Sequence, residues 1–500
     1  MLTEIKSQVV IGLEVHVQLA TAGKAFCGCA NRYGEPPNTL TCPICLGYPG
    51  TMPMFNRRAL MLTARLAMAL GCTIHPHSVF SRKNYFYPDL PKGFQISQYD
   101  LPLATDGELI YEDDDGQELL CGIERVHLEE DTAKLIHAEG DGADSLLDFN
   151  RAGVPLVEVV GRPEITTPRA ARRYLEELKR VIESTGASDC DMEKGSLRVD
   201  VNVSLRNADG SFGTKIEVKN LNSFRSVERA LAHEVARQDE LIAGGAKLQR
   251  ETRLWDEREG TTLLMRIKEG ADDYRYFPEP DLPAIAVDDA FLTQISAELL
   301  EGPWCGFDQL PLARERWCRE HKIPPDDARI YASEPELYRV LRRAWELRLN
   351  VDVSTQLIQY IRPISLKNLI DDKPVYPPPA WIAAFAAGIA EKRIMGGTGG
   401  CSSFWNAWID RHMEVVEDAS VVTEIAAELG LIIEKVDEEA LAQFIRTAIA
   451  ENPKAVEMVR AGKENAVGPI MGAVMKALGG KADAAEIRRK ILTMIRELTP

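Results

Sequence analysis

Long apolar segments and a basic leader are both missing from this 500-residue sequence. No apolar run reaches the roughly 18 residues that are needed to cross a bilayer, so we expect no membrane span. The first residues, MLTEIKSQVVIGLEV, lack the basic head and apolar core of a signal peptide. Ten cysteines are too few for a disulfide scaffold in a chain of this length. We therefore expect a reduced, cytoplasmic location.

Several common catalytic motifs are also missing. The sequence contains no GxxxxGK[ST] phosphate loop, no GxGxxG after a strand, no GxSxG elbow and no HExxH zinc motif. The segment 396–403 (GGTGGCSS) carries serines but has no evident base nearby, so we interpret it as a Gly-rich loop. Positive charge is scarce too, because 59 Lys and Arg face 76 Asp and Glu and leave a net charge of −17. This balance excludes a bulk electrostatic hold on nucleic acid, although a local basic patch remains open.

Hydrophobic periodicity predicts an α+β fold in three domains. Apolar and polar residues alternate over 11–19, 197–206 and 215–219, which is typical of strands with one buried face. Amphipathic helices are predicted over 167–184 and 224–243. We predict the following domains: a mainly antiparallel-sheet domain at 1–294 with a zinc knuckle at 27–45, an all-helical domain at 295–415, and a small all-helical tail at 416–500.

Four cysteines form two close pairs. Cys27 and Cys29 are followed, after twelve residues, by Cys42 and Cys45. Two short knuckles let one chain supply the four thiolates that zinc prefers in a tetrahedron. Such a shell is closed, so a zinc ion here would be structural rather than catalytic. Unpaired buried thiols and a redox pair are the alternatives.

Acidic and imidazole side chains gather on the polar faces of the predicted strands. Glu14 and His16 share one face, residues 127–131 read HLEED, and Asp200 lies on another strand. Together these separate segments offer enough oxygen and imidazole to hold a divalent ion such as Mg²⁺ beside substrate phosphates. The alternative is ordinary surface charge on a half-exposed sheet.

The loop 81–94 combines cations with aromatic rings. It carries Arg82, Lys83 and Lys92 together with Tyr85 and three further aromatic residues. Aromatic rings beside cations suit a nucleotide or the 3′ end of an RNA, through stacking and phosphate pairing. A surface loop whose tyrosines seal the edge of a core is the alternative.

Long segments resemble the GatB subunit of the tRNA-dependent aspartyl/glutamyl-tRNA amidotransferases. The resemblance is densest from residue 10 to residue 285 and returns in the tail at 450–482. The matching segments are VIGLEVHVQL (10–19), RKNYFYPDLPKGFQISQYD (82–100), HLEEDTAK (127–134), DFNRAGVPLVEVV (148–160), KNLNSFRSVERAL (219–231), RETRLWDE (250–257) and DDYRYFPEPDLP (272–283).

The resemblance implies a carbon–nitrogen ligase that uses glutamine as amido donor. ATP would phosphorylate the side-chain carboxylate of misacylated Glu-tRNA(Gln), Asp-tRNA(Asn) or both, and channelled ammonia would then displace the phosphate. The implied partners are an amidase subunit and a small third subunit, which complete a heterotrimer, and the misacylated tRNA. The implied cofactors are Mg²⁺ and structural Zn²⁺, with ATP as co-substrate.

The resemblance also assigns residues. Glu14, His16, Glu130 and Asp200 would bind Mg²⁺, with Glu129 beside them. Lys83 and Lys92 would face phosphates or line the ammonia path, and Tyr85 would shape the pocket. The zinc ligands would be Cys27, Cys29, Cys42 and Cys45.

The tail is locally basic. Residues 451–500 contain nine Lys and Arg against six Asp and Glu. A tRNA backbone could be tracked by Lys463, Lys476, Arg488, Arg489 and Lys490. A solvated helix face is the alternative. At the level of function, the alternatives to the enzyme subunit are a non-catalytic tRNA-binding scaffold of the same complex and a stand-alone zinc-dependent hydrolase.

Overall fold

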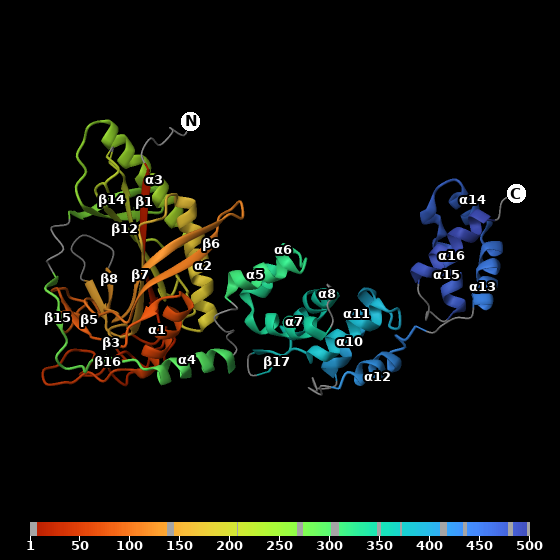
Figure 1. The fold of residues 1–500 in the computed structure, drawn as a ribbon, viewed down its shortest axis with the longest axis horizontal. Coiled ribbons are helices and arrows are strands. Elements are labelled where there is room, and N and C mark those ends of the chain that lie inside the picture. Colours follow the sequence, from red (N-terminus) through yellow and green to blue (C-terminus); the bar gives the residue numbers. More distant parts are fainter. Residues whose placement is uncertain are drawn as a thin grey trace. The chain divides into compact units, whose positions relative to one another are not determined.

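The computed structural model describes residues 8–137, 145–207, 209–267, 274–301, 310–347, 352–370, 373–410, 418–433, 438–478 and 484–497. The chain divides into two compact units, Met1–Arg314 and Glu315–Pro500. Figure 1 shows a first unit built around a large sheet and a second unit built of helices. The mixed α+β class is as predicted from the sequence. The three domain boundaries stay a prediction.

A nine-stranded, mostly antiparallel sheet forms the centre of the first unit. Its spatial order is β14-β13-β12-β11-β1-β10-β7-β6-β2, and the pair β12/β13 is parallel. The bounds are β1 Val9–Gln18, β2 Thr73–Ile74, β6 Ala104–Glu112, β7 Glu118–Glu130, β10 Pro155–Gly161, β11 Leu197–Leu205, β12 Ile216–Lys219, β13 Glu251–Asp256 and β14 Thr261–Ile267. The three strands predicted over 11–19, 197–206 and 215–219 are β1, β11 and β12, so those predictions are confirmed.

The two faces of the sheet differ in polarity because side chains alternate along each strand. In β1, Leu13, Val15 and Val17 are buried in the main hydrophobic core, whereas Glu14 and His16 point to the other face. Helices contact the sheet on the apolar side, namely α1 Arg57–Ala69, α2 Pro168–Thr185 and α3 Phe224–Ala243. The apolar face is therefore sealed, and the opposite face is left to polar side chains.

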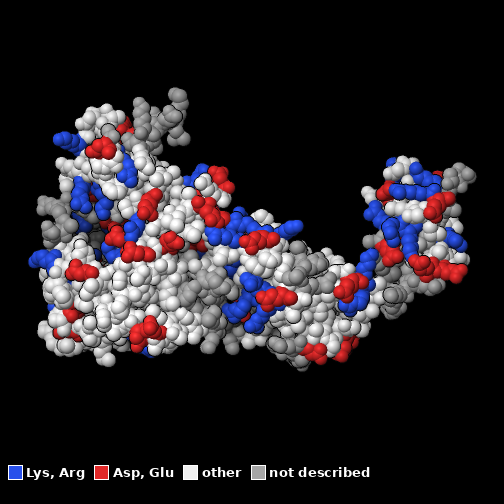
Figure 2. Space-filling view, in the orientation of Figure 1, with Lys and Arg blue, Asp and Glu red and all other residues white. Residues whose placement is uncertain are grey.

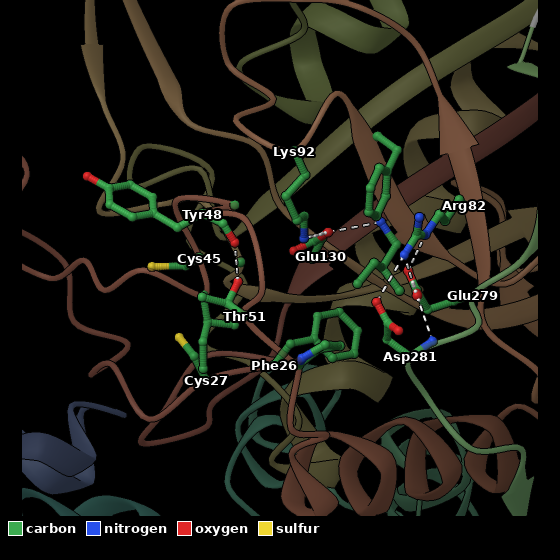
Figure 3. Close-up of a pocket in the computed structure, with 16 residues that line it drawn as sticks. Phe26, Cys27, Cys45, Tyr48, Thr51, Arg82, Lys92, Glu130, Glu279 and Asp281 are labelled. Carbon is green, nitrogen blue, oxygen red and sulfur yellow. Dashed lines mark hydrogen bonds and ion pairs between the residues drawn. The ribbon is translucent and has the colours of Figure 1, made fainter.

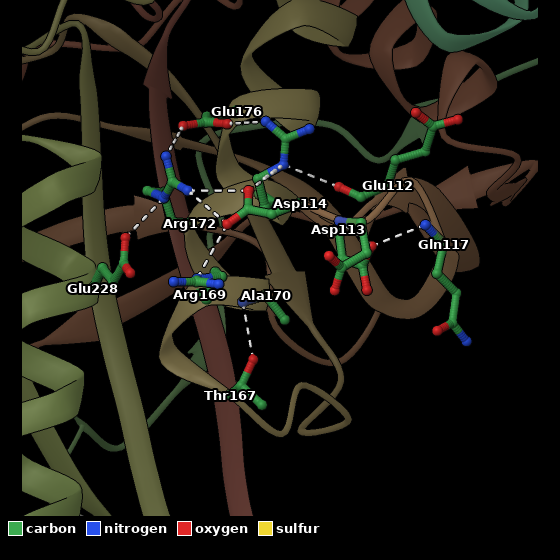
Figure 4. Close-up of polar contacts among 12 residues, drawn as sticks. Glu112, Asp113, Asp114, Gln117, Thr167, Arg169, Ala170, Arg172, Glu176 and Glu228 are labelled. Atoms are coloured by element: carbon green, nitrogen blue, oxygen red, sulfur yellow. Dashed lines mark hydrogen bonds and ion pairs between the residues drawn. The ribbon is translucent and has the colours of Figure 1, made fainter. Parts of the chain in front are cut away.

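Helix α2 shows how local sequence sets an element. Thr167 is the N-cap and its hydroxyl accepts a hydrogen bond from Ala170 N at 3.0 Å, while Pro168 occupies the first turn. Arg172 pairs with Asp114 at 3.2 Å and with Glu228 at 2.7 Å (Figure 4). These contacts tie α2 to the loop after β6 and to α3.

Smaller sheets surround the large one. They pair β15 with β4 and β5, β16 with β3, and β8 with β9. Their bounds are β3 His77–Ser78, β4 Ser81–Asn84, β5 Phe94–Ser97, β8 Lys134–His137, β9 Ser145–Asp148, β15 Phe277–Pro278 and β16 Ile285–Ala286. Helix α4 (Asp289–Glu301) is anchored to α1 because Arg65 pairs with Glu298 at 2.7 Å. The first unit thus extends past residue 294.

The second unit has two separate hydrophobic cores, one from Cys318 to Leu431 and one from Leu441 to Ile495. Its elements are α5 Pro311–Glu320 (which begins in the first unit), α6 Pro325–Ser333, α7 Pro335–Leu347, α8 Asp352–Thr355, the π-helix Gln356–Ile361, α9 Arg362–Ser365, β17 Leu369–Ile370, β18 Lys373–Pro374, α10 Pro379–Ala390, α11 Gly397–Asp410, α12 Ser420–Glu428, α13 Glu438–Glu451, α14 Pro453–Arg460, the 3₁₀ turn Glu464–Val467, α15 Gly468–Ala477 and α16 Ala484–Glu497. The predicted Gly-rich loop at 396–403 is wrong, because α11 begins at Gly397 and buries Cys401 in the first of these cores. No helix in the described part of the chain has the length and hydropathy of a membrane span.

Candidate functional site

Polar side chains from five adjacent strands share the face of the sheet opposite α1, α2 and α3. The register places His16 opposite Glu158 and Arg198, and it places Glu14 opposite Asp200. On the next strand His127 lies opposite Glu158. Cross-strand partners in an antiparallel pair project to the same side, so residues far apart in the sequence meet here.

His16, Glu129 and Glu158 form the centre of this face. His16 Nε2 lies 3.5 Å from Glu129 Oε1 and 3.6 Å from Glu158 Oε2. One ligand atom from each of the three residues lies within 4.8 Å of the others. Glu129 and Glu158 are both buried. We call these three residues the acidic cluster.

Nearby cations compensate the buried carboxylates. His127 Nε2 is 3.2 Å from Glu158 Oε2, and the buried Nδ1 of His127 has no partner among the described residues. Burial alone would raise the pKa of Glu158, but His127 and His16 outweigh it, so this pKa lies below its usual range. Burial likewise opposes the charged form of Lys83, yet Glu129, Tyr276 and Glu158 raise the pKa of Lys83 above its usual value. Lys83 therefore carries its charge beside the acidic cluster, and Tyr85 lies near it.

Glu14 and Asp200 lie on the same polar face but are engaged by other residues. Asn202 Nδ2 donates to Glu14 Oε1 at 2.8 Å, and Lys219 forms a close ion pair with Asp200. Lys219 also lies 3.5 Å from Glu217. The structure thus places Glu14 and Asp200 on the predicted face, each with its own partner.

Glu130 is separated from the other predicted magnesium ligands. It follows Glu129 directly in β7, so its side chain projects to the opposite face. There it pairs with Lys92 and accepts a hydrogen bond from Ile96 N at 2.9 Å. The predicted set of Glu14, His16, Glu130 and Asp200 therefore does not converge on one point. The physical reason is the alternation of side chains along a strand, which sends neighbours in HLEED to different faces.

A cavity of about 180 Å³ lies on the Glu130 side (Figure 3). Cys27, Cys45 and Tyr48 line it on one side, and Lys92 with Glu130 closes another. Across the cavity Arg82 holds Glu279 through two hydrogen bonds, of 2.7 Å and 2.8 Å. The wall is thus a sequence of paired charges beside the cysteines.

The four cysteines of the predicted knuckle do converge. Their sulfur atoms all lie within 4.8 Å of one another, and the Sγ atoms of Cys42 and Cys45 are 3.9 Å apart. A hydrogen bond from Cys27 lowers the pKa of Cys45 to about 4, whereas burial raises the pKa of Cys29 to about 11. One thiolate thus lies among thiols. A tetrahedral zinc ion fits this donor set and would hold all four sulfurs deprotonated.

Lys24 is a residue of this site that sequence reasoning missed. It is fully buried, and its Nζ lies 3.6 Å from Cys45 Sγ and 3.2 Å from the carbonyl oxygen of Phe149. Glu158 was missed as well. Its position in the alternating run LVEVV, on the strand next to His16, was the signal that could have found it.

The predicted tRNA-binding residues lie in the last core of the second unit. Lys463, Lys476, Arg488 and Arg489 are exposed, and basic side chains gather on the face of this region shown in Figure 2. Lys490 differs, because it pairs with Glu438 at 3.2 Å and with Glu486 at 3.5 Å.

Comparison with known proteins matches two family models to this chain. The model described as "GatB/GatE catalytic domain" matches residues 9–293, and the "GatB domain" matches residues 412–495. Three similar relatives are named as the GatB subunit of an aspartyl/glutamyl-tRNA(Asn/Gln) amidotransferase. The relative from Moorella thermoacetica is 42% identical over 489 residues, covering 96% of this chain and 98% of its own. Those from Thermoanaerobacter sp. (strain X514) and Brevibacillus brevis are 43% and 41% identical, covering 96% and 99% of this chain and 97% and 100% of their own.

Proposed function

The chain belongs to the GatB family of aspartyl/glutamyl-tRNA(Asn/Gln) amidotransferase subunits, and from this membership we propose that it amidates misacylated tRNA. The substrate is Glu-tRNA(Gln), Asp-tRNA(Asn) or both. The chain works in a complex with an amidase subunit that releases ammonia from glutamine and with a small third subunit. The acidic cluster of His16, Glu129 and Glu158 inside the matched catalytic domain is the observation that carries this proposal.

The reaction has two steps. A side-chain carboxylate oxygen of the aminoacyl group attacks the γ-phosphorus of ATP, the bond to the β-phosphate oxygen breaks, and ADP leaves. Ammonia then attacks the acyl carbon, phosphate leaves, and a proton is released as the amide forms. Phosphoryl transfer mainly needs alignment and neutralised charge. Lys83, charged and next to the acidic cluster, is placed to face the phosphates.

We assign the cation site to His16, Glu129 and Glu158, with Glu14 and Asp200 further along the same face. Two carboxylates and one imidazole whose ligand atoms lie within 4.8 Å fit a divalent ion. A bound Mg²⁺ would neutralise phosphate charge. Lys92 and Glu130, on the opposite face, line the cavity beside the cysteines instead, and we assign them to the path of ammonia.

The test compares adjacent glutamates in the reconstituted complex. We expect Glu129→Gln and Glu158→Gln to raise the Mg²⁺ concentration needed for half-maximal activity and to lower ATP-dependent amidation by about 100-fold. Glutamine hydrolysis by the amidase subunit should continue. Glu130→Gln, which changes the same residue type one position away, should leave the Mg²⁺ requirement unchanged. Equal Mg²⁺ requirements in all three variants would refute the assignment.

The same complex separates the enzyme from a scaffold. If the chain only holds tRNA, His16→Ala should bind and support amidation like the unmodified protein. If the proposal is right, His16→Ala should bind tRNA normally and release no ADP in response to it. Asp114→Asn, in the distant network of α2, is the control for nonspecific damage.

A further inference from the structure

Four tyrosine rings form a row that starts beside the acidic cluster. The ring centroids of Tyr85 and Tyr274 are 5.9 Å apart, and those of Tyr274 and Tyr276 are 6.1 Å apart. Tyr276 then stacks on Tyr99, with 4.1 Å between centroids and 4° between planes. We call these four residues the tyrosine row. Its members come from two segments, one around β4 and β5 and one just before β15.

The inner end of the row faces the chemistry. Lys83 Nζ lies 5.1 Å from the centroid of the Tyr274 ring. Burial raises the pKa of Tyr276 to about 12, and Glu129 and Glu158 add to this rise. That influence requires both carboxylates to lie near the phenol. The row is therefore continuous with the acidic cluster.

The outer end of the row is open. Tyr99 is 47% exposed even though Tyr276 covers one face of its ring, so the other face meets solvent. A free aromatic face of this kind is a platform on which a nucleobase can stack.

A cation accompanies the platform. Arg275 lies between Tyr274 and Tyr276, is exposed, and makes no ion pair with any residue that the structure describes. Its φ of 44° is unusual for a residue other than glycine. Asn84 Nδ2 holds this conformation through a hydrogen bond of 2.8 Å to the carbonyl oxygen of Arg275. Strained backbone that a neighbour holds in place often marks a binding site.

We propose that Tyr99, Tyr276 and Arg275 bind the 3′-terminal adenosine of the misacylated tRNA, with the base stacked on Tyr99 and a phosphate near Arg275. This inference rests on the proposed function. The terminal adenosine carries the acyl group, so anchoring it at the outer end of the row directs that group toward the acidic cluster. The adenine of ATP has a similar face, and a docked protein partner could also cover Tyr99. The experiment separates the three.

The first measurement is binding of a labelled acceptor-stem RNA to the full complex. Removing one base–aromatic stack should weaken binding by about 5- to 150-fold. We expect this loss in Tyr99→Ala, and we expect the same loss when the unmodified protein binds an RNA that lacks the terminal adenosine. Combining both changes should cost no more than one alone, because both remove one interaction. Tyr99→Phe, which keeps the ring, should bind normally. Tyr33→Ala, another exposed tyrosine, is the matched control.

The second measurement is kinetic. Tyr99→Ala should raise the KM for the acylated tRNA and leave the KM for ATP and glutamine hydrolysis unchanged. A raised KM for ATP alone, or loss of the complex on gel filtration, would overturn the assignment to RNA, and so would additive losses in the binding cycle. If the unmodified complex does not amidate tRNA at all, the proposed function fails, while the binding cycle still decides on the stacking site.

Discussion

Lys24 is fully buried, and its surroundings explain how the protein accommodates a lysine there. Its Nζ donates to Phe149 O at 3.2 Å and lies 3.6 Å from Cys45 Sγ. A zinc ion with four thiolates carries a net charge of −2, which is costly to bury without a counter-charge. Lys24 supplies a positive group directly beside one of the sulfurs.

Replacing this lysine should loosen the metal. We expect Lys24→Met to lower zinc affinity by about 10- to 100-fold, as is typical when a partner of a metal ligand is lost. The measurement is zinc release from the full chain to a chromogenic chelator. Lys194→Met, which removes a lysine outside the metal site, should retain zinc normally. Unchanged retention in folded Lys24→Met would contradict the prediction.

Asp131 gives the first unit a dependence on pH. It is buried, and its Oδ2 accepts hydrogen bonds from Arg198 at 2.6 Å and from Gln18 at 3.0 Å. Burial alone would raise the pKa of Asp131, but Arg198 and Arg151 lower it below its usual 3.8. Because the folded pKa is depressed, this stabilisation is present above pH 3.8 and is lost as the pH falls toward the folded value.

Asp131→Asn should therefore destabilise the first unit most at neutral pH. We expect a loss of about 3 kcal/mol at pH 7, since both arginines lose a buried partner. The difference from the unmodified protein should shrink below pH 4. Urea unfolding at each pH, followed by a hydrogen-exchange pulse at one fixed pH on peptides from β7 and β11, measures this. A difference that grows in acid would contradict the sign.

Single elements can be tested through their caps. Thr167→Ala removes the hydrogen bond to Ala170 N, so we expect α2 to lose about 1 kcal/mol. Thr167→Ser keeps the hydroxyl and should retain most of the stability. Hydrogen exchange of peptides from the first turn of α2 is the readout. Equal protection in the Ala and Ser variants would show that the cap contributes nothing.

Elements were more predictable than the contacts between them. The alternation around His16 and the helical period of 224–243 are local, so β1 and α3 could be predicted from the sequence. The grouping of His16 with Glu158 depends on β1 pairing with β10, across more than a hundred residues. Nothing local in the sequence fixes that register. The Gly-rich segment 396–403 misled for the opposite reason, because burial of Cys401 and Phe404 in the helical core outweighs weak helix propensity.

For the whole molecule, the net charge of −17 has to be reconciled with an RNA substrate. Charge is not spread evenly, because residues 451–500 carry nine basic against six acidic residues. Phosphate contacts act over about a Debye length, so the local balance matters more than the total. The exposed arginines of α16 are available to phosphates, whereas Lys490 in the same helix is engaged by Glu438 and Glu486.

This difference within one helix makes the tail testable by salt dependence. Each cation that contacts a phosphate adds about 1 to the slope of log affinity against log salt concentration. We expect Arg488→Gln and Arg489→Gln each to reduce the slope for tRNA by about 1, and Lys490→Gln to reduce it by less. Filter binding of tRNA to the complex at several salt concentrations measures the three slopes. If the arginine variants keep the full slope, the basic residues of α16 only solvate the helix. If Lys490→Gln loses as much as they do, its ion pairs must open when tRNA binds, and the exposed charges of the free tail would no longer identify the contacts.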